Sequence, residues 1–236
     1  MLTLAFDSTA KIASVAVLDG ENVLAEYNVN NGLTQSELLL PMAEGILSSL
    51  HISLDDIGLF ATSVGPGSFT GVRIGAALVK GLAFGRNIPC AGVSTLDALA
   101  ENLRGIRGII LACMDARRGQ VYNAVYRSDG KKTEKLCPDR AVSISDLAIE
   151  VRTYTEPIYI VGDGYDTARE GLIKAGITPE VTPEALRLES ASSVAKIAVR
   201  EYLNGKALSD LDISPTYLRM PQAERERLER LEKEKG

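Results

Sequence analysis

Histidine is almost absent from this sequence, with His51 the single one in 236 residues. A metal site of the H-E-x-x-H type needs two histidines on one helix face, so the chain cannot build one. A Ser-His-Asp triad would have to use His51, which follows a helical pattern and has no nucleophile elbow near it. The sequence therefore argues against metallopeptidase and triad-hydrolase chemistry, and we expect no catalytic residues and no bound metal.

Cysteine is scarce as well. Cys90, Cys113 and Cys137 are far apart and odd in number, and the first two lie in apolar runs typical of strands. Residues in such runs are usually small buried hydrophobic side chains and not disulfide partners or metal ligands. We expect free thiols.

Positive charge is limited and scattered. The net charge is −5, and no basic cluster is longer than Arg117-Arg118 or Lys131-Lys132. A stand-alone RNA-binding protein needs a basic face, because phosphate neutralisation supplies most of its affinity, so direct RNA binding is disfavoured. No apolar run reaches the roughly 18 residues of a membrane span, and the start MLTLAFDST lacks the basic region of a signal peptide. We expect a cytoplasmic protein with no membrane association.

The first 104 residues alternate strands and helices. The pattern predicts strands at Leu2–Asp7, Ala13–Asp19, Asn22–Val29, 57–64 and 88–93, and helices at 34–50, 71–86 and 95–103. Hairpin strands followed by β-α-β-α indicate a mixed sheet covered by helices.

The second half, from residue 105 to 221, repeats this order of elements. An apolar strand ends at Asp115, as the first strand ends at Asp7, and a hairpin and further helices follow. Two such lobes predict a two-lobed α/β fold of the actin/Hsp70/sugar-kinase (ASKHA) type, with mixed sheets flanked by helices. The last segment, 222–236, is charge-rich and is predicted to be a helix, more typical of a solvated surface than of a partner-binding one.

The turn Asp7-Ser8-Thr9 lies where this superfamily holds nucleotide phosphate, with the aspartate organising a hydrated magnesium ion. A second-lobe loop should hold the adenine, and the candidate, Val161-Gly162-Asp163-Gly164, is short and places an acid there. We therefore expect a degenerate nucleotide site and no cofactor.

The run GPGSFTG at residues 65–71 joins a predicted strand to a predicted helix, as phosphate-binding loops do. The lysine of a P-loop is missing, and Arg73 lies inside the helix. The favoured interpretation is structural: Gly65 and Gly67 permit a tight turn, and Ser68 or Thr70 caps the helix.

The two predicted helices of the first lobe are more apolar than a core-facing helix needs. On residues 34–50 the apolar arc reaches about 200°, where a core-facing stripe needs a little over 100°. Its members are Leu38, Leu39, Leu40, Met42, Ala43, Ile46, Leu47 and Leu50. On residues 71–86 only Arg73 and Lys80 interrupt Val72, Ile74, Leu78, Val79, Leu82, Ala83 and Phe84. Such helices are either central in a core or covered by another chain, and the pattern leaves both open.

These motifs together resemble the TsaB, or YeaZ, family. The resemblance rests on Asp7-Ser8-Thr9, QSELLLP at 35–41, GPGSFTGVRIG at 65–75, DARRGQVY at 115–122 and YLR at 217–219. Gln35 stands where many members have histidine. The family's catalytic paralogue, TsaD, carries two metal-binding histidines after the strand that matches 88–93, and the corresponding stretch here, STLDAL at 94–99, has none.

The resemblance implies a non-catalytic scaffold subunit that pairs its first-lobe helices with those of a TsaD-like catalytic subunit, in a complex that also uses a TsaE-like ATPase. Homodimers and only indirect tRNA contact are implied as well. The expected interface comprises Leu39, Leu40, Met42, Ala43, Ile46, Leu47, Gly71, Val72, Ile74, Gly75, Leu78 and Leu82. Two alternatives are an ATP-dependent small-molecule kinase of the same superfamily and a glycoprotease-type metallopeptidase, which the histidine count opposes.

Overall fold

The computed structural model describes residues 1–206 and 209–219, and within them the strands form two mixed sheets. The first sheet has the order β3-β2-β1-β4-β5. β1 is antiparallel to β2 and parallel to β4. The strands are β1 (Leu2–Asp7), β2 (Ala13–Asp19), β3 (Asn22–Val29), β4 (Leu59–Gly65) and β5 (Cys90–Ser94).

The second sheet repeats the centre of the first. Its order is β10-β6-β7-β8, and β9 also pairs with β7. β6 is antiparallel to β7 and parallel to β10, as β1 is to β2 and β4. The strands are β6 (Arg107–Asp115), β7 (Gln120–Asp129), β8 (Thr133–Lys135), β9 (Arg140–Ser143) and β10 (Ile158–Val161). The predicted two-lobed α/β fold, with mixed sheets flanked by helices, is confirmed.

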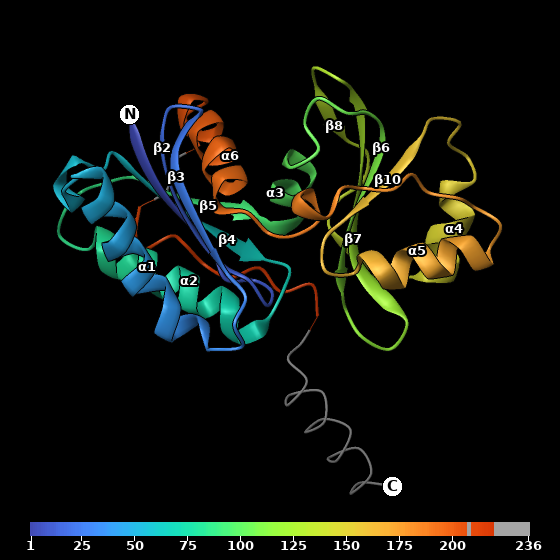
Figure 1. Ribbon diagram of the computed structural model, residues 1–236, viewed down its shortest axis with the longest axis horizontal. Coiled ribbons are helices and arrows are strands. Elements are labelled where there is room, and N and C mark those ends of the chain that lie inside the picture. The colour runs from blue at the N-terminus through green and yellow to red at the C-terminus, as the bar shows by residue number, and fades with distance from the viewer. Residues whose placement is uncertain (207–208, 220–236) are drawn as a thin grey trace, which may run out of the picture.

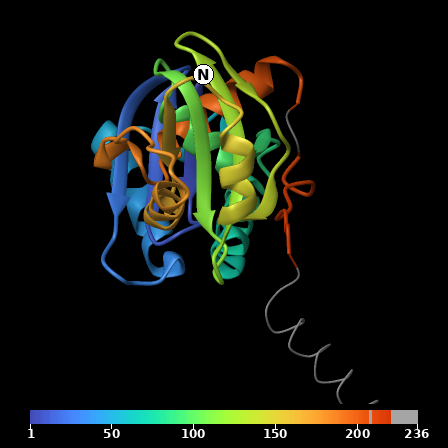
Figure 2. The same ribbon diagram turned by 90° about the vertical axis from the view of Figure 1, so that its right-hand side faces the viewer.

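Helices cover both faces of each sheet, so the molecule is built in layers (Figure 1). α1 (Gln35–Leu50) and α2 (Phe69–Ala83) cover the outer face of the first sheet, while α3 (Thr95–Glu101) and α6 (Ala191–Leu203) lie between the sheets. Figure 2 shows α4 (Ile144–Val151) and α5 (Tyr165–Lys174) in front of the second sheet, on its outer face. Short 3-10 turns occur at Leu54–Asp56 and Glu184–Leu186.

The alternation of side chains along β1 explains why two different layers form on one sheet. Leu4 and Phe6 point into the core beneath α1 and α2, whereas Ala5 points to the core beneath α6. Large side chains fill the first core, and alanines such as Ala16 and Ala61 let α6 approach the sheet closely.

The predicted lobe boundary needs a correction. The sequence assigned residues 105–221 to the second lobe, but α6 packs on β1 and β2 of the first sheet. Ile213 is buried in the core under α1 and α2, and the N–H of Thr216 donates to the carbonyl of Val64 at 2.7 Å. The chain therefore returns to the first lobe after residue 190. The predicted tail, 222–236, lies outside the described residues.

Element boundaries differ from the prediction by a few residues. The helix predicted at 71–86 begins at Phe69, because the hydroxyl of Ser68 accepts the N–H of Gly71 and caps it. The strand predicted at 57–64 begins at Leu59. In the part of the chain that the structure covers, no helix is long and apolar enough to cross a bilayer.

Candidate functional site

The predicted phosphate-binding turn at the end of β1 is buried, and its polar groups are hydrogen-bonded within the protein. Asp7, Ser8 and Thr9 are all buried. Oδ1 of Asp7 accepts the N–H and the hydroxyl of Thr9 at 2.9 and 2.7 Å, and Oδ2 accepts the hydroxyl of Ser63. Burial raises the pKa of Asp7, and these hydrogen bonds offset part of that rise. The carboxylate is fully buried and already accepts three hydrogen bonds, so it is not accessible to a hydrated metal ion in this structure.

The glycine-rich run 65–71 packs against this turn. The N–H of Ser68 donates to the carbonyl of Thr9 at 2.7 Å, and the hydroxyl of Ser8 donates to the carbonyl of Gly71 at 2.9 Å. A Cβ on Gly71 would lie 1.8 Å from the carbonyl oxygen of Ser8, and one on Gly67 would lie 2.5 Å from that of Thr9. The glycines are therefore required for close contact between α2 and the turn, which agrees with the structural interpretation of this motif.

A cleft of about 640 Å³ and another of about 530 Å³ open at the junction of the lobes. The smaller one is bounded by the turn after β1, the glycine-rich run, the turn between β6 and β7 (the β6–β7 turn), and residues 216–219. Asp163 of the predicted adenine loop also lines it, and its Oδ1 accepts the N–H of Asp115 at 2.9 Å. The structure thus brings the predicted loops of the two lobes to one cleft, which we call the interlobe cleft.

Polar contacts join the lobes on either side of α3. Arg219, the last residue that the structure describes, donates to the carbonyl of Ala116 in the second lobe at 3.1 Å. Asp97 on α3 accepts the hydroxyl of Tyr126 at 2.6 Å and the ammonium of Lys135 at 2.7 Å. These bonds connect the two lobes on both sides of α3.

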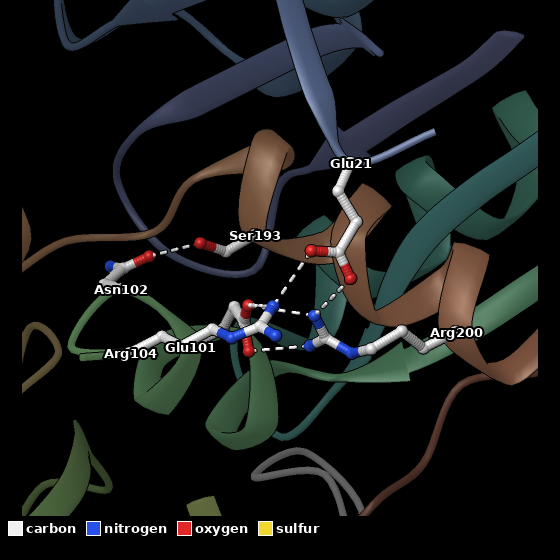
Figure 3. Close-up of polar contacts among 6 residues, drawn as sticks. All are labelled: Glu21, Glu101, Asn102, Arg104, Ser193 and Arg200. Carbon is white, nitrogen blue, oxygen red and sulfur yellow. Dashed lines mark hydrogen bonds and ion pairs between the residues drawn. The ribbon is translucent and has the colours of Figure 1, made fainter. Parts of the chain in front are cut away.

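Beside the larger cleft, hydrogen bonds connect the segment that follows α3 to the segment that precedes α6. These are the two segments that cross between the lobes. The side-chain amide of Asn102 donates to the carbonyls of Leu186 and Leu188 at 3.2 and 2.7 Å, and it accepts the hydroxyl of Ser193 at 2.7 Å. Figure 3 shows this contact next to an ion-pair network of Glu21, Glu101, Arg104 and Arg200. Both crossings are therefore anchored to α3 and α6.

Glu189 is the most unusual titratable group at the junction. It is 4% exposed, and neither carboxylate oxygen has a hydrogen-bond partner among the residues that the structure describes. Burial, followed by the charges of Asp7 and Asp163, raises its pKa well above the ordinary value. Burial without a hydrogen-bond partner therefore disfavours the ionised form of this carboxyl group.

The predicted partner interface on α1 and α2 divides into two groups. Seven of its residues belong to the protein's own core or to buried backbone, so they cannot form an outer surface: Leu39, Met42, Ala43, Ile46, Gly71, Val72 and Gly75. The four residues of α1 pack in the core against the first sheet, and Gly71 and Gly75 of α2 lie against Ser8 and Thr62. The remaining five are exposed or half-buried: Leu40, Leu47, Ile74, Leu78 and Leu82. This part of the prediction was too wide.

Several residues at the junction were not identified from the sequence. Asp97, Lys135 and Glu189 lie in no motif and follow no period that marks them. Arg219 lies in the YLR motif, which was noted only as part of a resemblance. A contact between residues more than 100 positions apart leaves no local pattern.

Comparisons with known proteins give a TsaD family model and TsaB relatives. The family model described as TsaD, tRNA N6-adenosine threonylcarbamoyltransferase, matches residues 34–226. The tRNA threonylcarbamoyladenosine biosynthesis protein TsaB of Bacillus subtilis is 34% identical over 168 residues, which cover 71% of this chain and 72% of that protein. TsaB of Escherichia coli is 32% identical over 227 residues, which cover 93% and 95% of the two chains.

Solved structures agree with this result. YeaZ from Pseudomonas aeruginosa superposes with a TM-score of 0.77 at 25% identity, covering 92% of this chain and 99% of that one. A P. aeruginosa protein described as similar to the peptidase YeaZ gives a TM-score of 0.79 at 24% identity with the same coverage. The chain belongs to the TsaB, or YeaZ, family of tRNA threonylcarbamoyladenosine biosynthesis proteins.

Proposed function

We propose that this chain is a non-catalytic subunit that binds and stabilises a TsaD-like transferase, so that the complex modifies the adenosine next to the tRNA anticodon. A TsaE-like ATPase acts in the same complex, and a second copy of this chain can compete for the same surface. Catalysis then belongs to the TsaD-like subunit.

The observation that carries the proposal is the apolar surface left on α1 and α2 after the core is filled. Leu40 is 43% exposed and Phe84, directly after α2, is 75% exposed. Leu47, Ile74, Leu78 and Leu82 are half-buried along the same two helices, which lie side by side (Figure 1). Apolar side chains clustered on neighbouring helices are typical of a surface that a partner protein covers.

The buried turn after β1 and the hydrogen bonds between the lobes also favour a scaffold over a kinase. A kinase of this superfamily needs Asp7 free to hold magnesium and lobes free to close on substrate. Here Asp7 is fully buried and hydrogen-bonded, and Arg219, Asp97 and Asn102 connect the lobes.

Charge substitutions on the exposed apolar positions test the proposal. We expect Leu40→Glu and Leu78→Glu to weaken binding to the TsaD-like subunit of the same organism by roughly 30-fold each, as loss of an interface hot spot does. Ile149→Glu is the matched control, because Ile149 is 68% exposed on α4, in the other lobe. Titration calorimetry measures the affinities, and thermal melting checks that each variant is folded. Leu39, at 1% exposure, is unsuitable because its substitution would disrupt the core.

Folded Leu40→Glu and Leu78→Glu variants that bind the TsaD-like subunit as tightly as the wild type would contradict the interface. A second measurement tests the pathway: depletion of this protein should lower threonylcarbamoyladenosine in total tRNA, measured by mass spectrometry of nucleosides. An unchanged level would reject the proposed role.

A further inference from the structure

Basic side chains that are far apart in the sequence meet around the interlobe cleft. Lys11 comes from the turn after β1, Arg117 from the β6–β7 turn, and Arg219 from the last described segment, and all three line the cleft. Arg118 follows Arg117 on the exposed turn. Within residues 1–206 and 209–219, none of these four side chains forms an ion pair with a carboxylate.

Two acidic residues line the same cleft, but their carboxylates hold the β6–β7 turn itself. Oδ1 of Asp115 accepts the N–H of Arg117 at 2.7 Å, and Oδ1 of Asp163 accepts the N–H of Asp115 at 2.9 Å. These bonds fix the backbone that carries the arginines, and they leave the guanidinium groups free for another partner.

The β6–β7 turn places its arginines in an unfavourable backbone conformation. Arg117 and Arg118 have φ values of 61° and 56°, in the left-handed region. This region costs an L-residue with a long side chain roughly 1 kcal/mol, and glycine and asparagine adopt it more readily. Two adjacent arginines occupy these positions although glycine or asparagine would cost less there.

Aromatic rings lie among the basic groups. Phe69, Tyr122 and Tyr217 line the cleft, and Tyr217 is 42% exposed. The rings of Phe69 and Tyr217 lie 5.0 Å apart, and the guanidinium of Arg219 lies 5.8 Å from the ring of Tyr122. Cations that neutralise phosphates, interleaved with rings on which bases stack, are typical of surfaces that bind single-stranded nucleic acid. An acidic peptide would use the charges but not the rings.

We propose that the rim of the interlobe cleft binds a single-stranded segment of RNA directly. Its phosphates contact Lys11, Arg117, Arg118 and Arg219, and a base stacks beside Phe69 and Tyr217, of which Tyr217 is 42% exposed. The sequence disfavoured direct RNA binding because it contains no long basic run, but folding gathers these charges from three separate segments. The surface is distinct from the apolar patch on α1 and α2, so this inference does not depend on the proposed scaffold role.

The test measures binding of the full chain to a fluorescent transfer RNA transcript and to a short single-stranded RNA, by anisotropy over a range of salt concentrations. Arg117→Asn with Arg118→Asn removes two charges and eases the backbone, so the variant should fold. We expect its affinity to fall roughly 25-fold near 0.1 M salt, and the slope of log K against log salt to fall by about 1.4. The matched control is Lys131→Asn with Lys132→Asn, an exposed basic pair at the other end of β7, which should bind as the wild type does.

Four outcomes would overturn the inference: no RNA binding by the wild type at low salt, wild-type affinity in the arginine variant, an equal loss in the lysine control, or polyglutamate binding as tightly as RNA. Complete displacement of the RNA by ATP at micromolar concentration would also reject it in favour of a mononucleotide site. The arginine variant should still bind the TsaD-like subunit, and Leu78→Glu should still bind RNA, so failure of either proposal is distinguishable.

Discussion

Arg200 on α6 holds the carboxylate of Glu101 on α3 with two hydrogen bonds, at 2.6 and 3.1 Å (Figure 3). The side chain of Glu101 is 8% exposed and that of Arg200 is 32% exposed. Glu21, between β2 and β3, contacts the same guanidinium at 3.2 Å. The pair therefore fixes the two helices that fill the space between the sheets.

Loss of this guanidinium should destabilise the protein more than loss of an ordinary surface pair. Arg200→Ala leaves a nearly buried carboxylate with Arg104 as its remaining ion-pair partner among the described residues. We expect a decrease in the free energy of unfolding of about 2 kcal/mol, measured by urea denaturation. Lys174→Ala is the control, because Lys174 and Glu170 form an exposed pair at 3.8 Å whose loss should change stability by less than about 0.5 kcal/mol. If Arg200→Ala lowers the free energy of unfolding by no more than about 0.5 kcal/mol, as expected for the control, the network adds nothing to stability.

Two glycines on α2 should respond in opposite directions to the same substitution. Gly71→Ala places a methyl group 1.8 Å from the carbonyl oxygen of Ser8, so α2 must move away from the turn after β1. We expect a loss of about 3 kcal/mol or more, or failure to fold. Gly81→Ala meets no atom within 4 Å and should stabilise the helix by about 0.5–1 kcal/mol. Thermal melting measures the change in stability of both variants. A Gly71→Ala variant as stable as the wild type would contradict the observed packing.

Glu189 should make the stability of the protein fall as the pH rises. Its pKa in the folded state is well above 4.5, the ordinary value, so the folded state binds a proton that the unfolded state releases. Stability therefore decreases between pH 4.5 and the folded-state pKa, by up to about 1.4 kcal/mol per pH unit. Glu189→Gln does not titrate, so its advantage in stability over the wild type should be smallest below pH 4.5 and should grow as the pH rises.

Denaturation of the wild type and Glu189→Gln at a series of pH values measures this difference. Glu184→Gln serves as the control, because Glu184 is exposed and lines the larger cleft, as Glu189 does. The difference in stability between this variant and the wild type should not change with pH. A Glu189→Gln curve parallel to that of the wild type would mean that Glu189 is ionised in the folded protein.

The sequence alone was sufficient for the elements and for the family. The strand pattern of Leu2–Asp7, the apolar period of α1 and the capping serine before α2 are local patterns, and each agrees with the predicted element within a few residues. The motif GPGSFTGVRIG identified the family before any fold was known, and the tight packing of its glycines explains why these residue types occur there.

The neighbours of each element were decided by the tertiary structure. The apolar face of α6 does not specify which sheet it covers, and the prediction chose the wrong lobe. The helical period of α1 could not decide whether Leu39 enters the protein's own core or meets a partner, and the structure places it in the core. The hydroxyl of Ser63 donates to the carboxylate of Asp7, which is 56 positions away in the sequence. Lys11, Arg117 and Arg219 line one cleft only because the lobes fold against each other. Local periodicity depends on adjacent residues, whereas contacts between distant residues depend on how the whole chain fills its core, and a single sequence does not display that.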